Sequence, residues 1–373
     1  MKNIVIAGYA RTPFTLANKG ALVKTRPDDL AAIAISGLVE SSGLNPQDIE
    51  DLILGCAFPE GEQGLNVARL VALHAGLPQS VAGVTVNRFC GSSMQAIHQA
   101  AGAIQMGAGE LFICAGVESM TRVPMMGFNP MPNPALAEKL PAYIGMGETA
   151  ENLASKYNIS RADQELFALN SQTKAAAAQS DGRLAAEIVA VNGVTEDGCI
   201  RSGTTLEGLA DLRPSFDENG SVTAGTSSPL TDGAAAVVVC SEEYAAAHGL
   251  ETLAKIRSIA VSGCAPEIMG IGPVLSSRKA LERAGLEVGD IDIIELNEAF
   301  ASQSLACIHD LALDPERINL DGGAIALGHP LGATGARITG KAAQLLKREG
   351  KQFALATQCI GGGQGIATVL EAV

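Results

Sequence analysis

The fold is decided by a stretch that occurs twice, first as Gly43-Leu-Asn-Pro-Gln-Asp-Ile-Glu-Asp-Leu-Ile-Leu-Gly-Cys-Ala-Phe58 and again as Gly285-Leu-Glu-Val-Gly-Asp-Ile-Asp-Ile-Ile-Glu-Leu-Asn-Glu-Ala-Phe300. The two copies align without a gap, so that Asp48 falls on Asp290, an offset of 242 residues. Each copy begins with a glycine that ends a helix and finishes with an apolar strand. An ungapped repeat of this kind predicts two related α/β halves.

Short apolar strands alternate with alanine-rich helical segments outside the repeat, which is typical of a layered α/β fold. A helix is expected over Pro27–Ser42, because proline suits the first turn, two aspartates follow it and Gly43 ends it. The expected strands are Asn3–Ala7, Asp51–Gly55, Leu111–Ala115, Ala235–Cys240, Lys255–Val261, Asp292–Leu296, Phe353–Ala356 and Ile366–Leu370. A pseudo-dyad between the halves would bring equivalent loops together and so create a place for a site.

The segment 117–228 has no counterpart in the other half and is predicted to be an inserted loop domain or lid. The remaining chain then divides into an N-terminal half, 1–116 with 229–250, and a C-terminal half, 251–373. Within the insert, a helix over Ser160–Ser180 is expected, with Ser160 as its cap. Five methionines of the insert either line a flexible apolar surface or fill gaps in the core; they are Met120, Met125, Met126, Met131 and Met146.

Composition limits the class of protein. The 373 residues are 47% hydrophobic, and 26 Lys and Arg against 40 Asp and Glu give a formal net charge of −14. An acidic surface of this kind repels phosphate backbones, so general nucleic-acid binding is not expected, and an anionic small ligand would need local positive potential. No apolar run has the roughly 18 residues of a membrane span, and no signal-peptide pattern precedes the first strand. We therefore expect a cytoplasmic protein.

Eight scattered cysteines form no CxxC pair and have no zinc-ligand spacing, so neither a metal site nor a disulfide framework is predicted. Cys90 stands apart, because a strand-like run ends at it and a helical pattern follows. Gly91 would permit a tight turn, and Ser92 or Ser93 would cap the helix. Unpaired backbone N–H groups and the positive end of a helix dipole would then lower the pKa of the Cys90 thiol, which indicates a nucleophile.

His329 lies in Gly322-Gly-Ala-Ile-Ala-Leu-Gly-His-Pro-Leu-Gly-Ala-Thr-Gly335, where glycines on both sides allow backbone or ligand to approach closely. Pro330 is a plausible first residue of a helix. The imidazole could stabilise a thiolate or donate to a developing oxyanion. A phosphate-binding loop is the competing interpretation, but the stretch lacks the Lys-Ser/Thr of a Walker motif.

Two further residues follow strands of the second half. Cys359, in Gln358-Cys-Ile-Gly-Gly-Gly-Gln-Gly365, is a redox partner or an acid/base, and spacing alone does not choose between them. Asn297 ends the strand of the second repeat, where it can donate and accept hydrogen bonds without titrating; capping a helix is the structural alternative.

Four motifs taken together resemble the thiolase family, and within it the degradative 3-ketoacyl-CoA thiolases (acetyl-CoA acyltransferases) of fatty-acid β-oxidation. They are Asn87–Ser93, Asn297–Phe300, Gly322–Gly335 and Cys359–Gly365, and matching stretches extend over essentially the whole chain. The resemblance implies a duplicated, layered α/β/α/β/α thiolase-like fold with an inserted loop domain.

The resemblance also implies roles for individual residues. Cys90 would attack the 3-keto carbon, and Cys359 would protonate the departing acetyl-CoA enolate and later deprotonate coenzyme A. His329 would activate Cys90 and, with a water held by Asn297, form one oxyanion hole. The backbone N–H groups of Cys90 and Gly361 would form the other, which would explain the glycine at position 361.

Coenzyme A is implied as a substrate, with no tightly bound cofactor. Similar enzymes bind it through the inserted domain, and Arg213, Ser228 and Met146 fall at matching positions. Biosynthetic acetoacetyl-CoA members have a histidine where this chain has Gly145, and that difference favours the degradative subtype.

Three alternative functions remain open, and so does the assembly. The chain could be an acetoacetyl-CoA-forming biosynthetic thiolase, or a ketoacyl synthase, although synthases lack the second cysteine. It could also be a silent scaffold or acyl-CoA-binding subunit of a β-oxidation assembly. The implied assembly is a homodimer or homotetramer, and the Ala224-Gly-Thr-Ser-Ser-Pro pattern is like that of thiolase subunits that associate with a hydratase/dehydrogenase partner.

Overall fold

The computed structural model describes residues 2–373, and within them ten strands form one mixed sheet. The sheet order is β4-β3-β5-β6-β1-β7-β10-β9-β8, and the short β2 pairs with β6. The strands are β1 Ile4–Arg11, β2 Thr15–Leu16, β3 Asp51–Gly55, β4 Ala82–Val86, β5 Leu111–Ser119, β6 Thr231–Ser241, β7 Ala254–Gly263, β8 Ile293–Leu296, β9 Phe353–Ile360 and β10 Gln364–Glu371. Each of the expected strands has a counterpart among these, and several are longer than expected.

Twelve α-helices lie in the same described range. They are α1 Pro27–Ser42, α2 Val67–His74, α3 Ser92–Gln105, α4 Pro134–Lys139, α5 Met146–Lys156, α6 Arg161–Ser180, α7 Leu206–Ala210, α8 Glu242–His248, α9 Gly272–Ala284, α10 Ala301–Leu311, α11 Ala324–Leu327 and α12 Leu331–Glu349. Helix α1 has the expected bounds, with Pro27 in its first turn and Gly43 in the left-handed conformation after it. The side chain of Ser160 caps α6, as expected.

The repeated stretch supplies β3 in one half of the sheet and β8 in the other. Strand β3 runs parallel to β5, and β8 runs parallel to β9, so each repeat supplies the first strand of an equivalent parallel pair. The halves meet where β1 pairs antiparallel with β7, through Val5 with Lys255 and Ile6 with Ala254. The helices that precede the second strand of each pair, α3 and α12, pack against each other.

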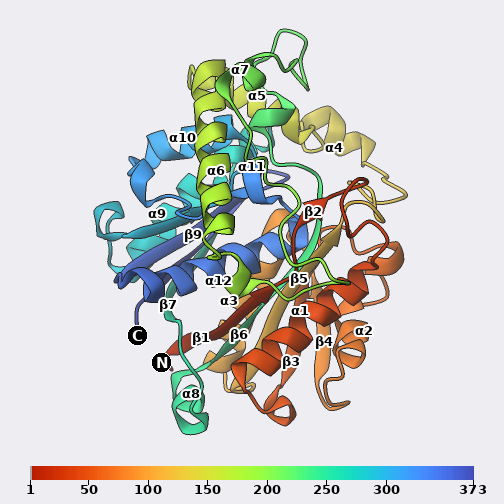
Figure 1. Cartoon of the computed structure of the whole chain (residues 1–373), viewed down its shortest axis with the longest axis vertical. Coiled ribbons are helices and arrows are strands. Elements are labelled where there is room, and N and C mark those ends of the chain that lie inside the picture. The colour runs from red at the N-terminus through yellow and green to blue at the C-terminus, as the bar shows by residue number, and fades with distance from the viewer. Residues whose placement is uncertain (1) are drawn as a thin grey trace.

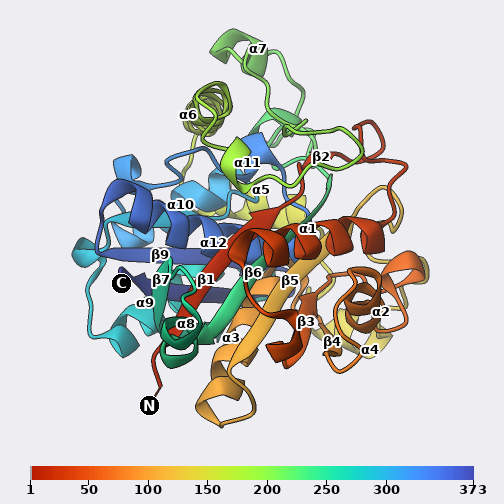
Figure 2. The same cartoon turned by 60° about the horizontal axis from the view of Figure 1, so that its bottom comes forward.

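Three hydrophobic clusters separate the molecule into layers. The first half-sheet consists of β4-β3-β5-β6-β1, and the second consists of β7-β10-β9-β8. One cluster lies between α1, α2 and one face of the first half-sheet, and another lies between α9, α10 and the second half-sheet. The central cluster joins side chains of α3 and α12 to both half-sheets, including Ile97, Ile338, Val237 and Ile366. Helices therefore cover both outer faces and fill the space between the half-sheets, which is the α/β/α/β/α arrangement (Figure 2).

The residues between β5 and β6 carry α4 to α7, and α6 and α7 stand at the top of the molecule (Figure 1). A buried ionic network ties this segment to both halves. The guanidinium of Arg11, on β1, binds Asp197 through two contacts of 2.7 Å and Glu187 through one of 2.7 Å. Lys341, on α12, binds Glu187 at 2.9 Å and Asp321 at 2.7 Å. Because isolated buried charges are costly, each of these groups depends on the others.

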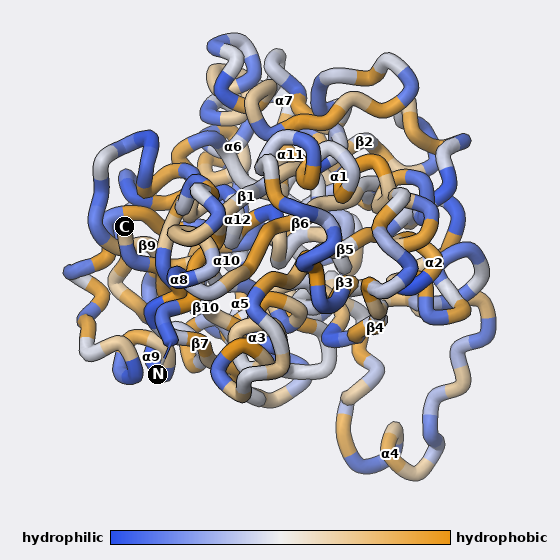
Figure 3. The backbone as a smooth tube through the Cα atoms, turned by 90° about the horizontal axis from the view of Figure 1, so that it is seen from below, coloured by the Kyte–Doolittle hydropathy of each residue, from blue (hydrophilic) through white to orange (hydrophobic). Residues whose placement is uncertain are grey.

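Helix α4 sits on a loop that projects away from the body (Figure 3). Several large apolar side chains of this loop are exposed, among them Met126, Phe128, Met131 and Leu140. Across residues 2–373, none of the helices combines the length and the apolar character that crossing a membrane requires.

Candidate active site

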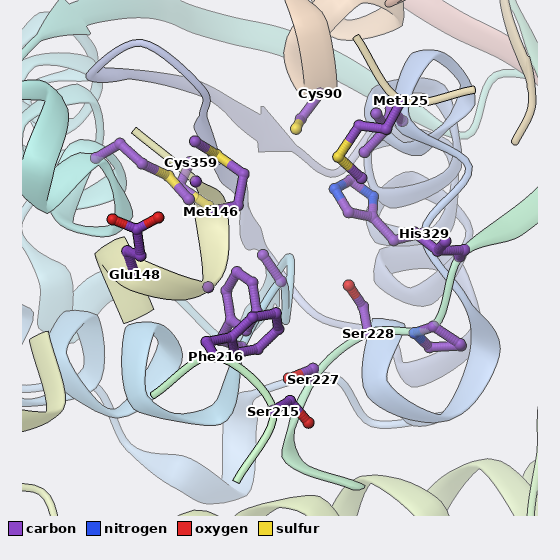
Figure 4. A pocket seen from close by; sticks show the side chains of 18 of the residues that line it. Cys90, Met125, Met146, Glu148, Ser215, Phe216, Ser227, Ser228, His329 and Cys359 are labelled. Atoms are coloured by element: carbon purple, nitrogen blue, oxygen red, sulfur yellow. The ribbon is translucent and has the colours of Figure 1, made fainter. Parts of the chain in front are cut away.

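A cavity of about 410 Å³ lies where the two halves and the segment between β5 and β6 meet (Figure 4). It brings together Cys90, His329 and Cys359, which are far apart in the sequence. Most of the remaining lining is apolar and includes Met120, Met125, Met146, Met269, Phe216, Phe300, Leu230 and Leu331. The cavity thus offers two thiols and an imidazole to an apolar ligand.

Cys90 lies in a 3₁₀ turn, Phe89–Gly91, between β4 and α3. The strain of this turn falls on Phe89, whose φ of 43° is rare for an aromatic residue, and not on Gly91, whose φ is −86°. The side chain of Asn87 stabilises the turn by accepting the Phe89 N–H at 2.8 Å. Sequence reasoning missed Phe89, because no residue type marks such a position.

The expected cap of α3 is wrong. Gly91 is the N-cap residue, and no side chain caps the helix. The hydroxyl of Ser92 instead accepts the Arg88 N–H at 2.9 Å, and that of Ser93 accepts the N–H of Ala336, on α12, at 2.8 Å. Both serines therefore hold neighbouring backbone rather than the helix end.

The expectation of an acidic thiol is also wrong. Burial raises the pKa of Cys90 to about 11, although the N–H groups of Gly361 and of Cys90 itself act in the opposite direction. Burial, followed by the nearby charge of Arg337, lowers the pKa of His329 to about 3. Near neutral pH the thiol of Cys90 and the imidazole of His329 are therefore both uncharged.

His329 lies just before α12, and three side chains fix its position. Its Nδ1 is 2.6 Å from the hydroxyl oxygen of Thr334, and its backbone N–H donates to Thr231 at 3.0 Å. Its Nε2 is 3.4 Å from the amide nitrogen of Asn297. Pro330 is the N-cap of α12 rather than its first helical residue, so the helix begins one residue later than expected.

The glycines around His329 serve helix packing. A Cβ on Gly335 would lie 2.3 Å from the backbone nitrogen of Met94, on α3, so the two central helices touch at this glycine. A Cβ on Gly332 would lie 2.5 Å from the carbonyl oxygen of Val117. The close approach explains the glycine pattern without a phosphate, which argues against the phosphate-loop interpretation.

Cys359 is the penultimate residue of β9 and is buried at the cavity wall. Burial first, and then the neighbouring Cys90, raise the pKa of its thiol well above the usual value, so the two thiols lie close enough to influence each other. The N–H of Gly361 faces the Cys90 sulfur. Neither the backbone conformation nor protein contacts require a glycine at position 361: its φ is not positive, and a Cβ would only touch Met146 Sδ at 3.5 Å.

Asn297 follows β8 and is fully buried. Helix α10 has Phe300 as its N-cap and no side-chain cap, so the capping alternative for Asn297 is wrong. Within residues 2–373 its Oδ1 has no hydrogen-bond partner, while its amide nitrogen lies near His329. This oxygen is therefore available to a water or a ligand.

Of the three residues expected to contact coenzyme A, two line the cavity and one does not. Met146, at the start of α5, and Ser228 line the cavity, whereas Arg213 is exposed and lies outside its lining. The methionines divide as well: Met120 and Met125 line the cavity with Met146, while Met126 and Met131 are exposed. Met269 and Phe216 were missed, because neither stands in a recognisable motif.

All eight cysteines are free thiols. In the part of the chain that the structure describes, no group of three or more His, Cys, Asp or Glu side chains is arranged to hold a metal ion.

Comparisons with known proteins agree with this geometry. The model of the thiolase N-terminal domain matches residues 4–243, and that of the thiolase C-terminal domain matches residues 250–372. The chain belongs to the thiolase family. It is 49% identical to a 3-ketoacyl-CoA thiolase of Bacillus subtilis and 50% identical to one of Idiomarina loihiensis, with full coverage of both chains in each case.

Solved structures show the same fold. The human mitochondrial 3-ketoacyl-CoA thiolase superposes with a TM-score of 0.92 at 37% identity, covering 100% of this chain and 99% of that one. The same human enzyme, solved in complex with CoA, superposes with the same TM-score and identity and covers 98% of its own chain. The layered, duplicated arrangement is thus the thiolase fold.

Proposed function

We propose that this protein is an acyl-CoA C-acyltransferase that cleaves 3-ketoacyl-CoA with coenzyme A into acetyl-CoA and a shortened acyl-CoA, in fatty-acid β-oxidation. The single observation that carries the proposal is the convergence of Cys90, His329 and Cys359 on one apolar cavity. Membership of the thiolase family and full-length relatives named 3-ketoacyl-CoA thiolase support it.

In the first half-reaction, the Cys90 sulfur attacks the 3-keto carbon while its proton passes to Nε2 of His329. The carbon–carbon bond then breaks, Cys90 keeps the acyl group as a thioester, and acetyl-CoA leaves as an enolate whose carbon takes the proton of Cys359. The N–H groups of Cys90 and Gly361 stabilise one oxyanion, and His329 with a water on Asn297 stabilises the other.

In the second half-reaction, the Cys359 thiolate takes the proton of coenzyme A. The resulting CoA thiolate attacks the acyl-Cys90 thioester, and the departing Cys90 sulfur recovers its proton from the His329 imidazolium. Every group returns to its starting state, so the same residues run the reverse Claisen condensation. The low pKa of His329 suits this scheme, because a weakly basic imidazole readily returns the proton to the departing Cys90 sulfur.

Coenzyme A acts here as a substrate, not as a resident cofactor. We assign Met146 and Ser228 to its thiol end, since both line the cavity beside the two thiols. Arg213 is exposed, two positions before the cavity residue Ser215, where a cation suits a phosphate group outside the cavity.

The degradative subtype is favoured over an acetoacetyl-CoA-forming biosynthetic enzyme. Gly145 borders the cavity without a side chain, and flexible methionines such as Met125 and Met269 surround it. Such a lining adapts to acyl chains of different length. A silent scaffold is disfavoured, because both thiols and the imidazole are present and face one cavity.

A homo-oligomer is part of the proposal. Strand β4 forms one edge of the sheet, and apolar side chains are exposed on it and on the adjoining α2 segment, including Val84, Leu65, Leu70 and Leu73. An unpaired strand edge beside apolar surface suits pairing with a second copy, which would give a homodimer or, through two such dimers, a homotetramer. A cytoplasmic location and an associated hydratase/dehydrogenase subunit also remain part of this proposal.

Three variants test the mechanism. Cys90→Ala should abolish both thiolysis of acetoacetyl-CoA and covalent acyl labelling, whereas Cys359→Ala should still acquire the label but fail to turn over. Cys240→Ala is the matched control, because that buried thiol lies at the opposite end of β6 from the cavity. An active Cys90→Ala protein, or a Cys359→Ala protein that turns over normally, would refute the assignments. Rates with acetoacetyl-CoA and with longer 3-ketoacyl-CoA substrates separate the degradative from the biosynthetic subtype.

A further inference from the structure

The imidazole of His329 has a side-chain neighbour on each of its two nitrogens. On one side, Nδ1 lies 2.6 Å from Oγ1 of Thr334. On the other side, Nε2 lies 3.4 Å from Nδ2 of Asn297 and borders the cavity that contains Cys90. A neutral imidazole has one N–H and one lone pair, so these neighbours decide which nitrogen can accept the thiol proton.

The hydroxyl of Thr334 has only one proton to donate. It donates to the carbonyl oxygen of Pro330 at 3.2 Å, the bond to the fourth preceding residue that threonine often makes in a helix. With that proton directed at Pro330, the hydroxyl oxygen acts as an acceptor toward His329, which assigns the ring proton to Nδ1. The amide nitrogen of Asn297 is a donor only, so its contact of 3.4 Å on the other side agrees with an unprotonated Nε2.

We propose that Thr334 is a positioning residue that holds His329 in the Nδ1–H tautomer and so keeps the Nε2 lone pair directed at the Cys90 thiol. This inference rests on the proposed function, in which Nε2 accepts that proton. The same hydroxyl continues to accept the Nδ1–H after the ring is protonated, which stabilises the imidazolium without moving it. Thr334 and His329 are both buried, so water does not replace the hydroxyl as acceptor.

Thr334 is well placed for this role because its backbone cannot move freely. It lies in the first turn of α12, one position before Gly335, where the helix touches α3. Thr231 fixes the other end of the histidine through its backbone N–H. Two threonines from different elements of the fold thus hold the histidine, Thr334 at its ring and Thr231 at its backbone.

The test compares three variants. Thr334→Val keeps the shape and removes the acceptor, Thr334→Ser keeps the acceptor, and Thr339→Val is the control. Thr339 makes the same helical bond, to Gly335 at 2.7 Å, but no imidazole lies on it. We expect Thr334→Val to slow acyl labelling of Cys90 by about tenfold to a hundredfold, because it leaves a buried donor unpaired. Thr334→Ser should stay within about threefold of the parent, and Thr339→Val within about twofold, at this scale of effect.

Nitrogen NMR of the full chain with ¹⁵N-labelled histidine reads the tautomer directly, with the His329 signals assigned by their loss in His329→Asn. We expect a protonated Nδ1 and an unprotonated Nε2 in the parent protein, and a shift toward protonated Nε2 in Thr334→Val. A parent protein with protonated Nε2 would overturn the proposal, and so would a Thr334→Val protein that labels at the parent rate. Equal slowing by Thr339→Val would reveal a merely structural effect. The NMR result does not depend on thiolysis, so it separates failure of this inference from failure of the proposed function.

Discussion

The turn between β9 and β10 carries three consecutive glycines whose surroundings differ, and alanine substitution at each should give a graded series. Gly361 has no positive φ, and its Cβ would make only ordinary contacts, the nearest at 3.5 Å. Gly362 has φ +81° with open space around it. Gly363 has φ +82°, and its Cβ would lie 2.3 Å from the carbonyl oxygen of Cys264. The three sites therefore separate backbone strain from steric overlap.

Magnitudes follow from these differences. Gly361→Ala should change the free energy of unfolding by less than about 1 kcal/mol, and in the stabilising direction, because alanine restricts the unfolded chain. Gly362→Ala should cost about 1–2 kcal/mol, the usual penalty of the left-handed region. Gly363→Ala adds overlap with backbone that cannot rotate away, since its own carbonyl binds the Cys264 N–H at 2.7 Å. The combined cost should be about 2–5 kcal/mol.

Urea unfolding at one fixed protein concentration measures the series, with circular dichroism as the readout. Thiolase activity of the folded variants gives a second readout, because a displaced turn would move the Gly361 N–H away from the Cys90 sulfur. A Gly363→Ala protein within about 1 kcal/mol of the parent would refute the steric argument. A Gly361→Ala protein as unstable as Gly363→Ala would refute the distinction between the positions.

Three further predictions concern buried charge and titration. Arg11→Met should destabilise the protein by about 3–5 kcal/mol in urea, because buried Asp197 loses its cation and buried Glu187 keeps only Lys341. Arg26→Met, in an exposed pair, should cost at most about 1 kcal/mol, and equal costs for the two variants would contradict this reasoning. Alkylation of Cys90 by iodoacetamide should rise about tenfold per pH unit between pH 7 and 9, since its pKa is about 11, and a plateau below pH 8 would indicate a resting thiolate. Burial lowers the pKa of His98 to about 3, below the unfolded value of 6.5, so stability should fall as the pH drops from 6.5 toward 3. His98→Gln should flatten that decline. If the urea midpoint has the same pH profile in His98→Gln as in the parent, His98 does not contribute to the acid sensitivity.

The repeat and the local signals of helices were sufficient to predict the fold class. Helix α1 has the expected bounds, because its start and stop signals are chemical properties of Pro27 and Gly43. The same holds for the α6 cap at Ser160. Strand positions followed from apolar runs, but their ends did not: β5 continues to Ser119, since pairing with β6 extends it.

The candidate site was predictable in its members and not in its electrostatics. Cys90, His329 and Cys359 stand in distinctive local sequences, and they do share a cavity. The direction of the Cys90 pKa shift depends on how deeply the sulfur is buried, which only tertiary packing decides. Thr334 was likewise hidden, because a threonine in a helical run gives no sign that an imidazole lies on its hydroxyl.

Packing against α3 explains why two related halves form an asymmetric site. In the repeat, Gly55 of the first half aligns with Asn297 of the second. A Cβ at Gly55 would lie 2.4 Å from the backbone nitrogen of Ser93, so α3 leaves no room for a side chain there. At the equivalent position of the second half, the amide of Asn297 has room and reaches His329. The two halves thus have equivalent strand ends, at Gly55 and at Asn297. Close packing of α3 against the first leaves room for a polar side chain only at the second.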